Sequence, residues 1–159
     1  MLTAGKKTKI RRSGGTFAII ASRYNARYVD AMVRAAQREL KKAGAKTIRV
    51  IRVPGAFEIP AVAARLAQQT NAWSALICLG VILRGQTDHA QQIAGAVSAS
   101  LAQLQLQRAL PVIHEVLLLE NEAQAIVRCL DKKHNRGTEA AQTALEMARV
   151  MASLPDFRS

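Results

Sequence analysis

Blocks of apolar residues alternate along the chain with stretches in which apolar and polar positions mix at a regular spacing. Residues 16–22, "TFAIIAS", are a short apolar run rich in strand-forming residues. From Val29 to Ala43 the apolar positions recur at the three- and four-residue spacing of a helix, and Gly44 follows, where a helix commonly ends. This first pattern predicts a strand followed by a helix.

The same order recurs in the next two segments. Residues 47–53, "TIRVIRV", alternate as a strand near a sheet edge does, and "VPGAFEIP" leads from them into a helix of small residues at 61–69. Residues 74–83, "SALICLGVIL", are continuously apolar, which is typical of a strand buried on both faces. An apolar stripe at helical spacing follows from His89 to Leu104. The run 74–83 is the predicted central strand.

The last segment supplies a fourth strand, "PVIHEVLLL" at 111–119, a short helix over 122–130, and a closing amphipathic helix at 138–151. Strands that alternate with helices through short connections predict an α/β fold, with a parallel sheet and helices on both faces. We expect one domain over 16–152, a basic flexible arm over 1–15 and a short tail over 153–159.

The charge of the chain raises the question of a nucleic-acid partner. Its 23 Lys and Arg outnumber its 11 Asp and Glu, for a formal net charge of +12. Five of the basic residues lie in "KKTKIRRSGG", before the first strand. Only 4% of the residues are aromatic, which is few for stacking on bases, and no nucleic-acid-binding motif occurs. A basic nucleic-acid-binding module is therefore the minor alternative to an enzyme.

Location and redox chemistry follow from what the sequence lacks. No apolar run approaches the roughly 20 residues of a membrane span, and the N-terminal residues lack the apolar segment of a signal peptide. We therefore expect a cytoplasmic protein without a membrane partner. Cys78 and Cys129 lie far apart and form no CxxC motif, so we interpret both as small buried residues and expect neither a disulfide nor a metal site.

In an α/β sheet, ligands bind beyond the carboxyl ends of the strands, which here lead into residues 23–25, 54–58 and 84–89. The third loop, "RGQTDH", has a glycine that allows close approach, with Gln86 and Thr87 just ahead of a helix N-terminus, where an anion binds well. His89 can accept or donate a proton at neutral pH. The alternatives are that Thr87 or Asp88 only caps the helix and that His89 is structural.

The other two loops also allow two interpretations. In "VPGAFEIP" two prolines fix the backbone and present Ala56, Phe57 and Glu58 at a strand end, either as a binding loop or as a rigid connection. Tyr24 either stacks on a planar ligand or covers the end of the sheet. Farther along, Arg128 and Arg136 either complete a phosphate site or belong to the solvated basic surface.

Taken together, "SRYN", "VPGAFEIP", "LGVILRGQTDH", "AIVRC", "HNRGTEAA" and "ALEMA" resemble the lumazine synthase family (6,7-dimethyl-8-ribityllumazine synthase) of riboflavin biosynthesis. The resemblance extends in order from about residue 17 to residue 151. It implies a flavodoxin-like three-layer sandwich with a four-stranded parallel sheet, assembled as pentamers and in many members as sixty-subunit icosahedral shells. It further implies a transferase without metal or organic cofactor, which condenses 5-amino-6-(D-ribitylamino)uracil with 3,4-dihydroxy-2-butanone 4-phosphate and releases phosphate and water.

The resemblance also assigns roles to the residues of the three loops. Tyr24 stands where the family usually has a phenylalanine that stacks on the pyrimidine. His89 becomes the proton-transfer residue, and Arg128 reaches the phosphate from the neighbouring subunit. The ribityl-uracil is held by the loop after the second strand, through Ala56, Phe57 and Glu58, and by the end of the third strand, through Val81, Ile82 and Leu83. The phosphate is held by the loop after the third strand, through Gln86 and Thr87.

Two features depart from the family pattern: the pair His114 and Glu115, and Asp88, which places a carboxylate beside His89 and the expected phosphate. His114 and Glu115 stand where the family commonly has a phenylalanine, which forms one wall of the adjacent subunit's site, and a small residue. A histidine can still stack, although it buries less apolar area. These departures leave one alternative function, a catalytically weak paralogue that serves as a shell or flavin-binding scaffold. The resemblance leaves open whether riboflavin synthase is a partner enclosed by the assembly.

Overall fold

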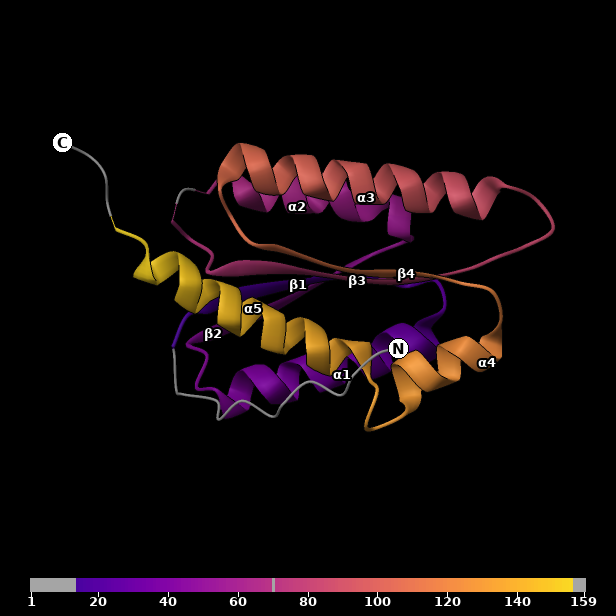
Figure 1. Ribbon diagram of the computed structural model, residues 1–159, viewed down its shortest axis with the longest axis horizontal. Helices are drawn as coiled ribbons and strands as arrows, with labels where there is room; N and C mark the ends of the chain where they lie inside the picture. Colours follow the sequence, from indigo (N-terminus) through magenta and orange to yellow (C-terminus); the bar gives the residue numbers. More distant parts are fainter. Residues whose placement is uncertain (1–13, 70, 156–159) are drawn as a thin grey trace.

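The computed structural model describes residues 14–69 and 71–155. At its centre lies a four-stranded parallel sheet in the order β2-β1-β3-β4 (Figure 1). The strands are β1 (Thr16–Ser22), β2 (Thr47–Val53), β3 (Ala75–Leu83) and β4 (Val112–Leu119). All three strand pairs are parallel, as the alternation of strands and helices predicts.

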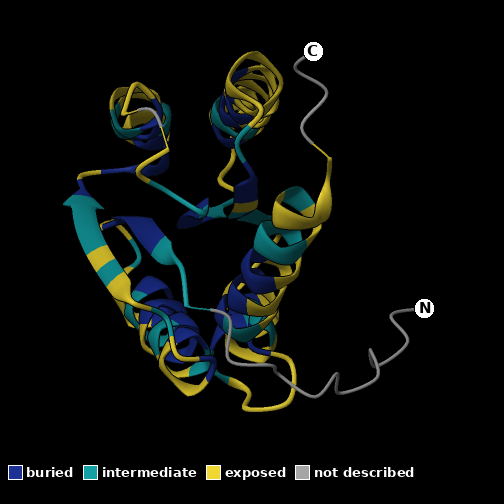
Figure 2. Ribbon diagram, turned by 90° about the vertical axis from the view of Figure 1, so that its left-hand side faces the viewer, coloured by how far each residue is buried: buried dark blue, intermediate teal, exposed yellow. Residues whose placement is uncertain are grey.

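Helices cover both faces of the sheet, which confirms the predicted three-layer α/β architecture (Figures 1 and 2). On one face lie η1 (Ala56–Glu58), α2 (Ile59–Ala67) and α3 (His89–Arg108). On the other lie α1 (Ala26–Lys42), α4 (Glu122–Ala125) and α5 (Arg136–Ser153). The predicted short helix over 122–130 is α4 followed by one wider π-helical turn, η2 (Ile126–Leu130).

Two hydrophobic clusters, one on each face of the sheet, make up the core. Phe17 and Ile19 of β1 point into the cluster under α1 and α5, and Ala18 and Ile20 point into the cluster under α2 and α3. β3 is buried from Ala75 to Val81, as predicted for a central strand, and β2 lies at a sheet edge, as its alternation predicts.

The α1/α5 layer depends on a close approach between the two helices. A Cβ atom built on Gly137, in the first turn of α5, would overlap the backbone carbonyl of Met32 in α1. Asn135 caps α5 with its side chain, whose Oδ1 accepts from Gly137 N–H at 2.8 Å while Nδ2 donates to the Cys129 carbonyl at 2.6 Å. These contacts attach the start of α5 to η2, which carries Arg128.

The arrangement brings the loops that follow β1, β2 and β3 to one edge of the sheet, on the right in Figure 1. The arm predicted over residues 1–15 and the tail predicted over 153–159 fall largely on residues 1–13 and 156–159, outside the described residues. Within the two described ranges, none of the helices combines the length and the apolar character that a membrane crossing requires.

Candidate active site

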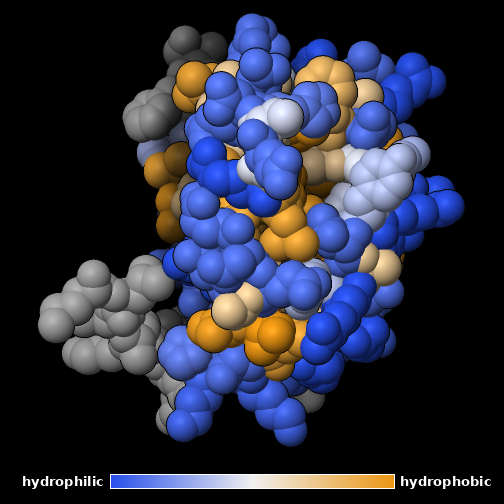
Figure 3. All heavy atoms as spheres, turned by 90° about the vertical axis from the view of Figure 1, so that its right-hand side faces the viewer, coloured by the Kyte–Doolittle hydropathy of each residue, from blue (hydrophilic) through white to orange (hydrophobic). Residues whose placement is uncertain are grey.

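The loops after β1 and β2, the end of β3 and the start of α3 line one pocket of about 750 Å³ at the carboxyl edge of the sheet. Figure 3 shows this edge of the molecule, where apolar side chains lie exposed between polar ones. The pocket is lined by Tyr24, Asn25, Gly55, Ala56, Phe57, Glu58, Val81, Ile82, Leu83, His89, Gln92, Ile93 and Ala96.

The loop after β1 is fixed to both neighbouring strand ends. Asn25 has a left-handed backbone (φ 60°), and its Nδ2 donates a 2.7 Å hydrogen bond to the Val81 carbonyl at the end of β3. The Tyr24 N–H donates to the Pro54 carbonyl at 3.0 Å, after β2. Tyr24 itself is 68% exposed and lines the pocket, so its ring is available to a ligand rather than buried over the sheet end.

The loop after β2 is closed by its own contacts. Gly55 N–H donates to Glu58 Oε2 at 3.0 Å, and a Cβ atom at Gly55 would stand 2.9 Å from the Tyr24 ring. Ala56 is buried, whereas Phe57 is 60% exposed beside the pocket. The two interpretations of this segment are therefore compatible, because a rigid connection also presents Phe57 and the Glu58 carboxylate to the pocket.

The loop after β3 is open by comparison. Gly85, Gln86, Thr87 and Asp88 are all exposed, and none of them lines the pocket. His89, the first residue of α3, does line it. The alternative that Thr87 or Asp88 only caps the helix has little support: Thr87 Oγ1 accepts a long hydrogen bond from His89 N–H at 3.4 Å, and the Asp88 side chain makes no capping hydrogen bond.

Most of the residues predicted for the site do converge on this pocket: Tyr24, Ala56, Phe57, Glu58, Val81, Ile82, Leu83 and His89. Asn25 and Gly55 lie in two of the predicted ligand loops but were not predicted as site residues, although "RYN" before a helix and the glycine between two prolines are turn signals. A row on α3 was not predicted either: Gln92 and Ile93, one turn after His89, and Ala96, two turns after it. A helix that begins at a pocket lines it with residues three and four apart, which was the available signal.

His114 and Arg128 do not line the pocket of their own chain. His114 lies on β4, where its Nδ1 accepts from Val116 N–H at 3.1 Å and its Nε2 lies 2.7 Å from Ser98 Oγ on α3. Because a backbone N–H only donates, the ring proton must be on Nε2, which donates to Ser98. Partial burial lowers the pKa of His114, which also favours this neutral form.

Glu115 points to the opposite face of the sheet and pairs with Arg136. Arg136 Nε and Nη2 donate to the two carboxylate oxygens at 3.1 and 3.2 Å, and Arg136 Nη1 pairs with Glu139 at 2.7 Å. Burial raises the pKa of Glu115, while the Arg136 guanidinium opposes that rise. Arg136 is therefore engaged within its own chain, which favours a structural role over the phosphate-binding interpretation.

The two cysteines are buried and free, as predicted. Burial raises the pKa of the Cys78 thiol to about 12 and that of Cys129 to about 11, so neither is a reactive thiolate. Among the residues that the structure describes, no three His, Cys, Asp or Glu side chains gather in a way that could hold a metal ion.

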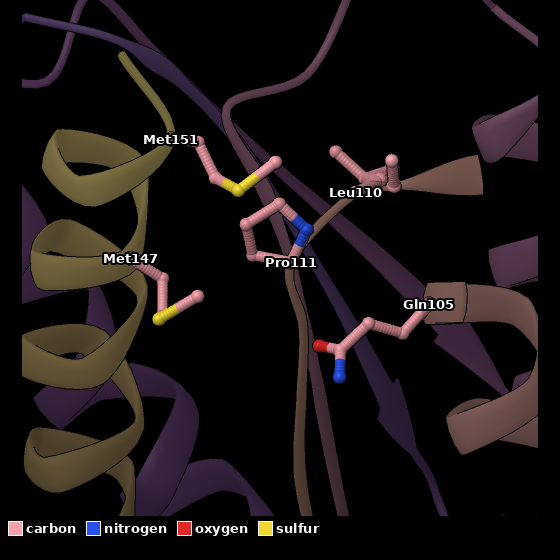
Figure 4. Close-up of a pocket in the computed structure, with 6 residues that line it drawn as sticks. Gln105, Leu110, Pro111, Met147 and Met151 are labelled. Atoms are coloured by element: carbon pink, nitrogen blue, oxygen red, sulfur yellow. The ribbon is translucent and has the colours of Figure 1, made fainter. Parts of the chain in front are cut away.

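A second, smaller cavity of about 180 Å³ lies between the ends of α3 and α5. Figure 4 shows Met147 and Met151 of α5 facing Pro111, with Gln105 of α3 nearby. The Gln105 amide oxygen already accepts from Val112 N–H at 2.9 Å. Apart from Gln105, whose amide oxygen is engaged in this way, the side chains that line this cavity are apolar, unlike those of the pocket at the carboxyl edge.

The fold and the larger pocket define a class: a flavodoxin-like α/β sandwich with its ligand site at the carboxyl edge of a parallel sheet. Residues 14–152 match the family model of 6,7-dimethyl-8-ribityllumazine synthase. The 6,7-dimethyl-8-ribityllumazine synthases of Xanthomonas euvesicatoria pv. vesicatoria (strain 85-10) and Xanthomonas axonopodis pv. citri (strain 306) are each 41% identical over 148 residues, which cover 92% of this chain and 96% of the relative. The chain belongs to the lumazine synthase family, the transferases of riboflavin biosynthesis.

Proposed function

We propose that the pocket binds 5-amino-6-(D-ribitylamino)uracil and 3,4-dihydroxy-2-butanone 4-phosphate side by side and that the chain condenses them to 6,7-dimethyl-8-ribityllumazine. The observation that carries this proposal is that segments distant in sequence, namely the loops after β1 and β2 and the start of α3, bring Tyr24, Glu58 and His89 to a single pocket. Holding two already reactive substrates in register removes much of the entropic barrier to their reaction.

The rigid half of the pocket is suited to the planar substrate. The exposed Tyr24 ring offers a stacking face, and the loop after β2 offers the Phe57 ring and the Glu58 carboxylate. With one Glu58 oxygen already held by Gly55 N–H, the carboxylate has a defined orientation for accepting hydrogen bonds from ribityl hydroxyls or ring N–H groups. Val81, Ile82 and Leu83 supply the wall at the end of β3.

The other half receives the butanone phosphate and moves protons. Gln86 and Thr87 lie exposed just ahead of α3, where N–H groups and the positive end of the helix dipole favour an anion. His89 lines the pocket beside them and transfers protons during imine formation and ring closure. Acid–base catalysis of this kind contributes about 10²- to 10⁴-fold.

A neighbouring copy completes the site in this proposal. Arg128 and His114 lie outside the pocket of their own chain, as residues donated to an adjacent site would, and Arg128 then binds the phosphate. We therefore propose a pentamer or a multiple of pentamers, working in the cytoplasm and supplying its product to riboflavin synthase. His114 presents a neutral ring in place of the wall that the family's phenylalanine forms.

The experiment is to incubate the purified protein with both substrates and to follow the fluorescence of the lumazine. Product should form much faster than in the spontaneous reaction, and 3,4-dihydroxy-2-butanone without its phosphate should be a far poorer substrate. Light scattering on the same sample measures the size of the assembly. Product formation at the spontaneous rate would instead favour the alternative function, a shell or flavin-binding scaffold, in which His114 and Glu115 replace the residues that form one wall of the family's site.

A further inference from the structure

Arg84 is a charged residue at the end of a nine-residue apolar strand, and nothing in the proposed function uses it. It follows Leu83, the last residue of β3, and precedes the open loop of residues 85–88. Its side chain is 34% exposed and does not line the pocket. An arginine at this point needs a physical reason, because an exposed polar residue of any kind could end a strand.

The Arg84 guanidinium joins two other elements. Its Nε pairs at 2.9 Å with Oε1 of Glu120, the residue immediately after β4. Its Nη2 donates at 2.9 Å to Oε1 of Gln91, in the first turn of α3. The Arg84 backbone N–H donates to the Leu119 carbonyl at 2.8 Å and so extends the β3–β4 ladder by one residue. One residue thus connects the end of β3, the end of β4 and the start of α3.

The loop that Arg84 precedes has little else to define its position. Its four residues are exposed, a Cβ atom on Gly85 would meet no heavy atom within 4 Å, and the His89 N–H bond to Thr87 is long at 3.4 Å. The end of the loop is defined by α3, where Gln92 N–H donates to the Asp88 carbonyl at 3.1 Å. Arg84 contacts that same first turn through Gln91, two residues after His89.

We propose that Arg84 is a positioning residue for the phosphate half of the site: its bridge between Glu120 and Gln91 fixes the 85–88 loop and the first turn of α3, and with them His89, against the pocket. This inference rests on the proposed function. An isolated exposed ion pair usually contributes little, but a planar guanidinium with two acceptors on different elements fixes a geometry that a lysine ammonium cannot reproduce.

Direct binding of the phosphate by Arg84 is the competing role, and Glu120 separates the two. If Arg84 bound the phosphate itself, Glu120 would compete with the substrate for the guanidinium, and its removal would strengthen binding. If Arg84 is a positioning residue, removal of Glu120 or Gln91 loosens the same loop and weakens binding. The variants Arg84→Gln, Arg84→Lys, Glu120→Gln and Gln91→Leu therefore decide the question in the assembled enzyme.

We expect Arg84→Gln to raise the KM for the butanone phosphate about tenfold and to lower kcat severalfold, with the KM for the ribitylaminouracil unchanged, because the loops around Tyr24 and Glu58 are held independently. Arg84→Lys should rescue only part of this loss. Glu120→Gln and Gln91→Leu should act in the same direction with smaller effects, and Arg84→Gln combined with Glu120→Gln should be no worse than Arg84→Gln alone.

Amide hydrogen exchange gives a readout that does not depend on turnover. In Arg84→Gln, exchange should accelerate in residues 85–92 and stay unchanged in residues 54–58. Lys42→Gln, which breaks an exposed pair with Glu39 at 3.4 Å far from this loop, is the control and should alter neither kinetics nor exchange.

Unchanged exchange in 85–92, a lower KM for the phosphate substrate in Glu120→Gln, or equal changes in both KM values would overturn the assignment of Arg84. The wild-type fluorescence assay decides the proposed function separately, since a wild type without activity rejects that function whatever the exchange of the loop shows.

Discussion

The loop after β2 lines the pocket and the loop after β3 leads into His89 at its border, but the two loops are built in opposite ways. Residues 54–58 are tied to the loop after β1 through the Pro54 carbonyl and closed by the Gly55–Glu58 hydrogen bond, with Gly55 and Ala56 buried. Residues 85–88 are exposed and held mainly at their ends. The closed loop suits the planar substrate that we propose for it, and the open backbone of residues 85–88 suits the proposed phosphate.

The difference is physically reasonable for two substrates of different kinds. A stacking site gains from rigidity, because ring and carboxylate must meet a flat ligand in one geometry. A phosphate has oxygens in several directions and can gather N–H groups and a neighbouring arginine around itself. Variants in the two loops should therefore affect different kinetic constants, which is how the comparison can be tested.

The largest effect on the kinetic constants should come from His89, which follows the open loop. We expect His89→Ala to lower kcat by about 10²- to 10⁴-fold, because proton transfer is lost while both binding halves remain. His134→Ala removes an exposed histidine that pairs with Asp131 and should leave kcat unchanged. Steady-state kinetics at several pH values measures both; a change in KM alone would mean that the open loop binds without transferring protons.

The next effect should come from the rigid loop. In Gly55→Val the new side chain meets the Tyr24 ring at 2.9 Å and Glu58 Oε2 at 3.0 Å from its Cβ alone. Overpacking of this kind costs about 1–3 kcal/mol, equivalent to roughly 5- to 150-fold in binding. We expect that loss in the KM for the ribitylaminouracil. Thermal unfolding separates a distorted pocket from a destabilised fold, and an unchanged KM would show that this loop is not preorganised.

The two loops show which features of the structure could be predicted from the sequence and which could not. The four strands and the pocket residues of the rigid loop could be predicted, because burial and turn chemistry are local properties that periodicity and two prolines record. The contacts of Arg84 could not, since Glu120 and Gln91 become its partners only once β4 and α3 are placed. The same holds for His114, whose partner Ser98 comes within 2.7 Å of its Nε2 only once α3 lies beside β4.

A smaller effect should come from the residue assigned to the neighbouring subunit. Arg128→Ala should raise the KM for the butanone phosphate about tenfold with little change in kcat, since a hydrogen bond to a charged group contributes about 1.5–3 kcal/mol and the Arg128 side chain is only half-buried in its own chain. Lys132→Ala removes an exposed basic residue nearby and is the matched control. Mixing Arg128→Ala with His89→Ala protein tests the shared site: in mixed assemblies a fraction of the sites should combine His89 of one copy with Arg128 of its neighbour and show the wild-type KM for the butanone phosphate at high kcat, a combination that neither variant has alone.

The smallest effect should come from the glycine that mirrors Gly55. Gly85→Ala places a Cβ atom where no heavy atom lies within 4 Å, so the melting temperature should stay the same, in contrast to Gly55→Val. If the phosphate approaches the backbone here, the methyl group should raise only the KM for the butanone phosphate, by about threefold or less, which corresponds to under 1 kcal/mol. Equal losses in Gly55→Ala and Gly85→Ala would contradict the contrast between a closed and an open loop, because then the contacts of Gly55 with Tyr24 and Glu58 would count for no more than empty space beside Gly85.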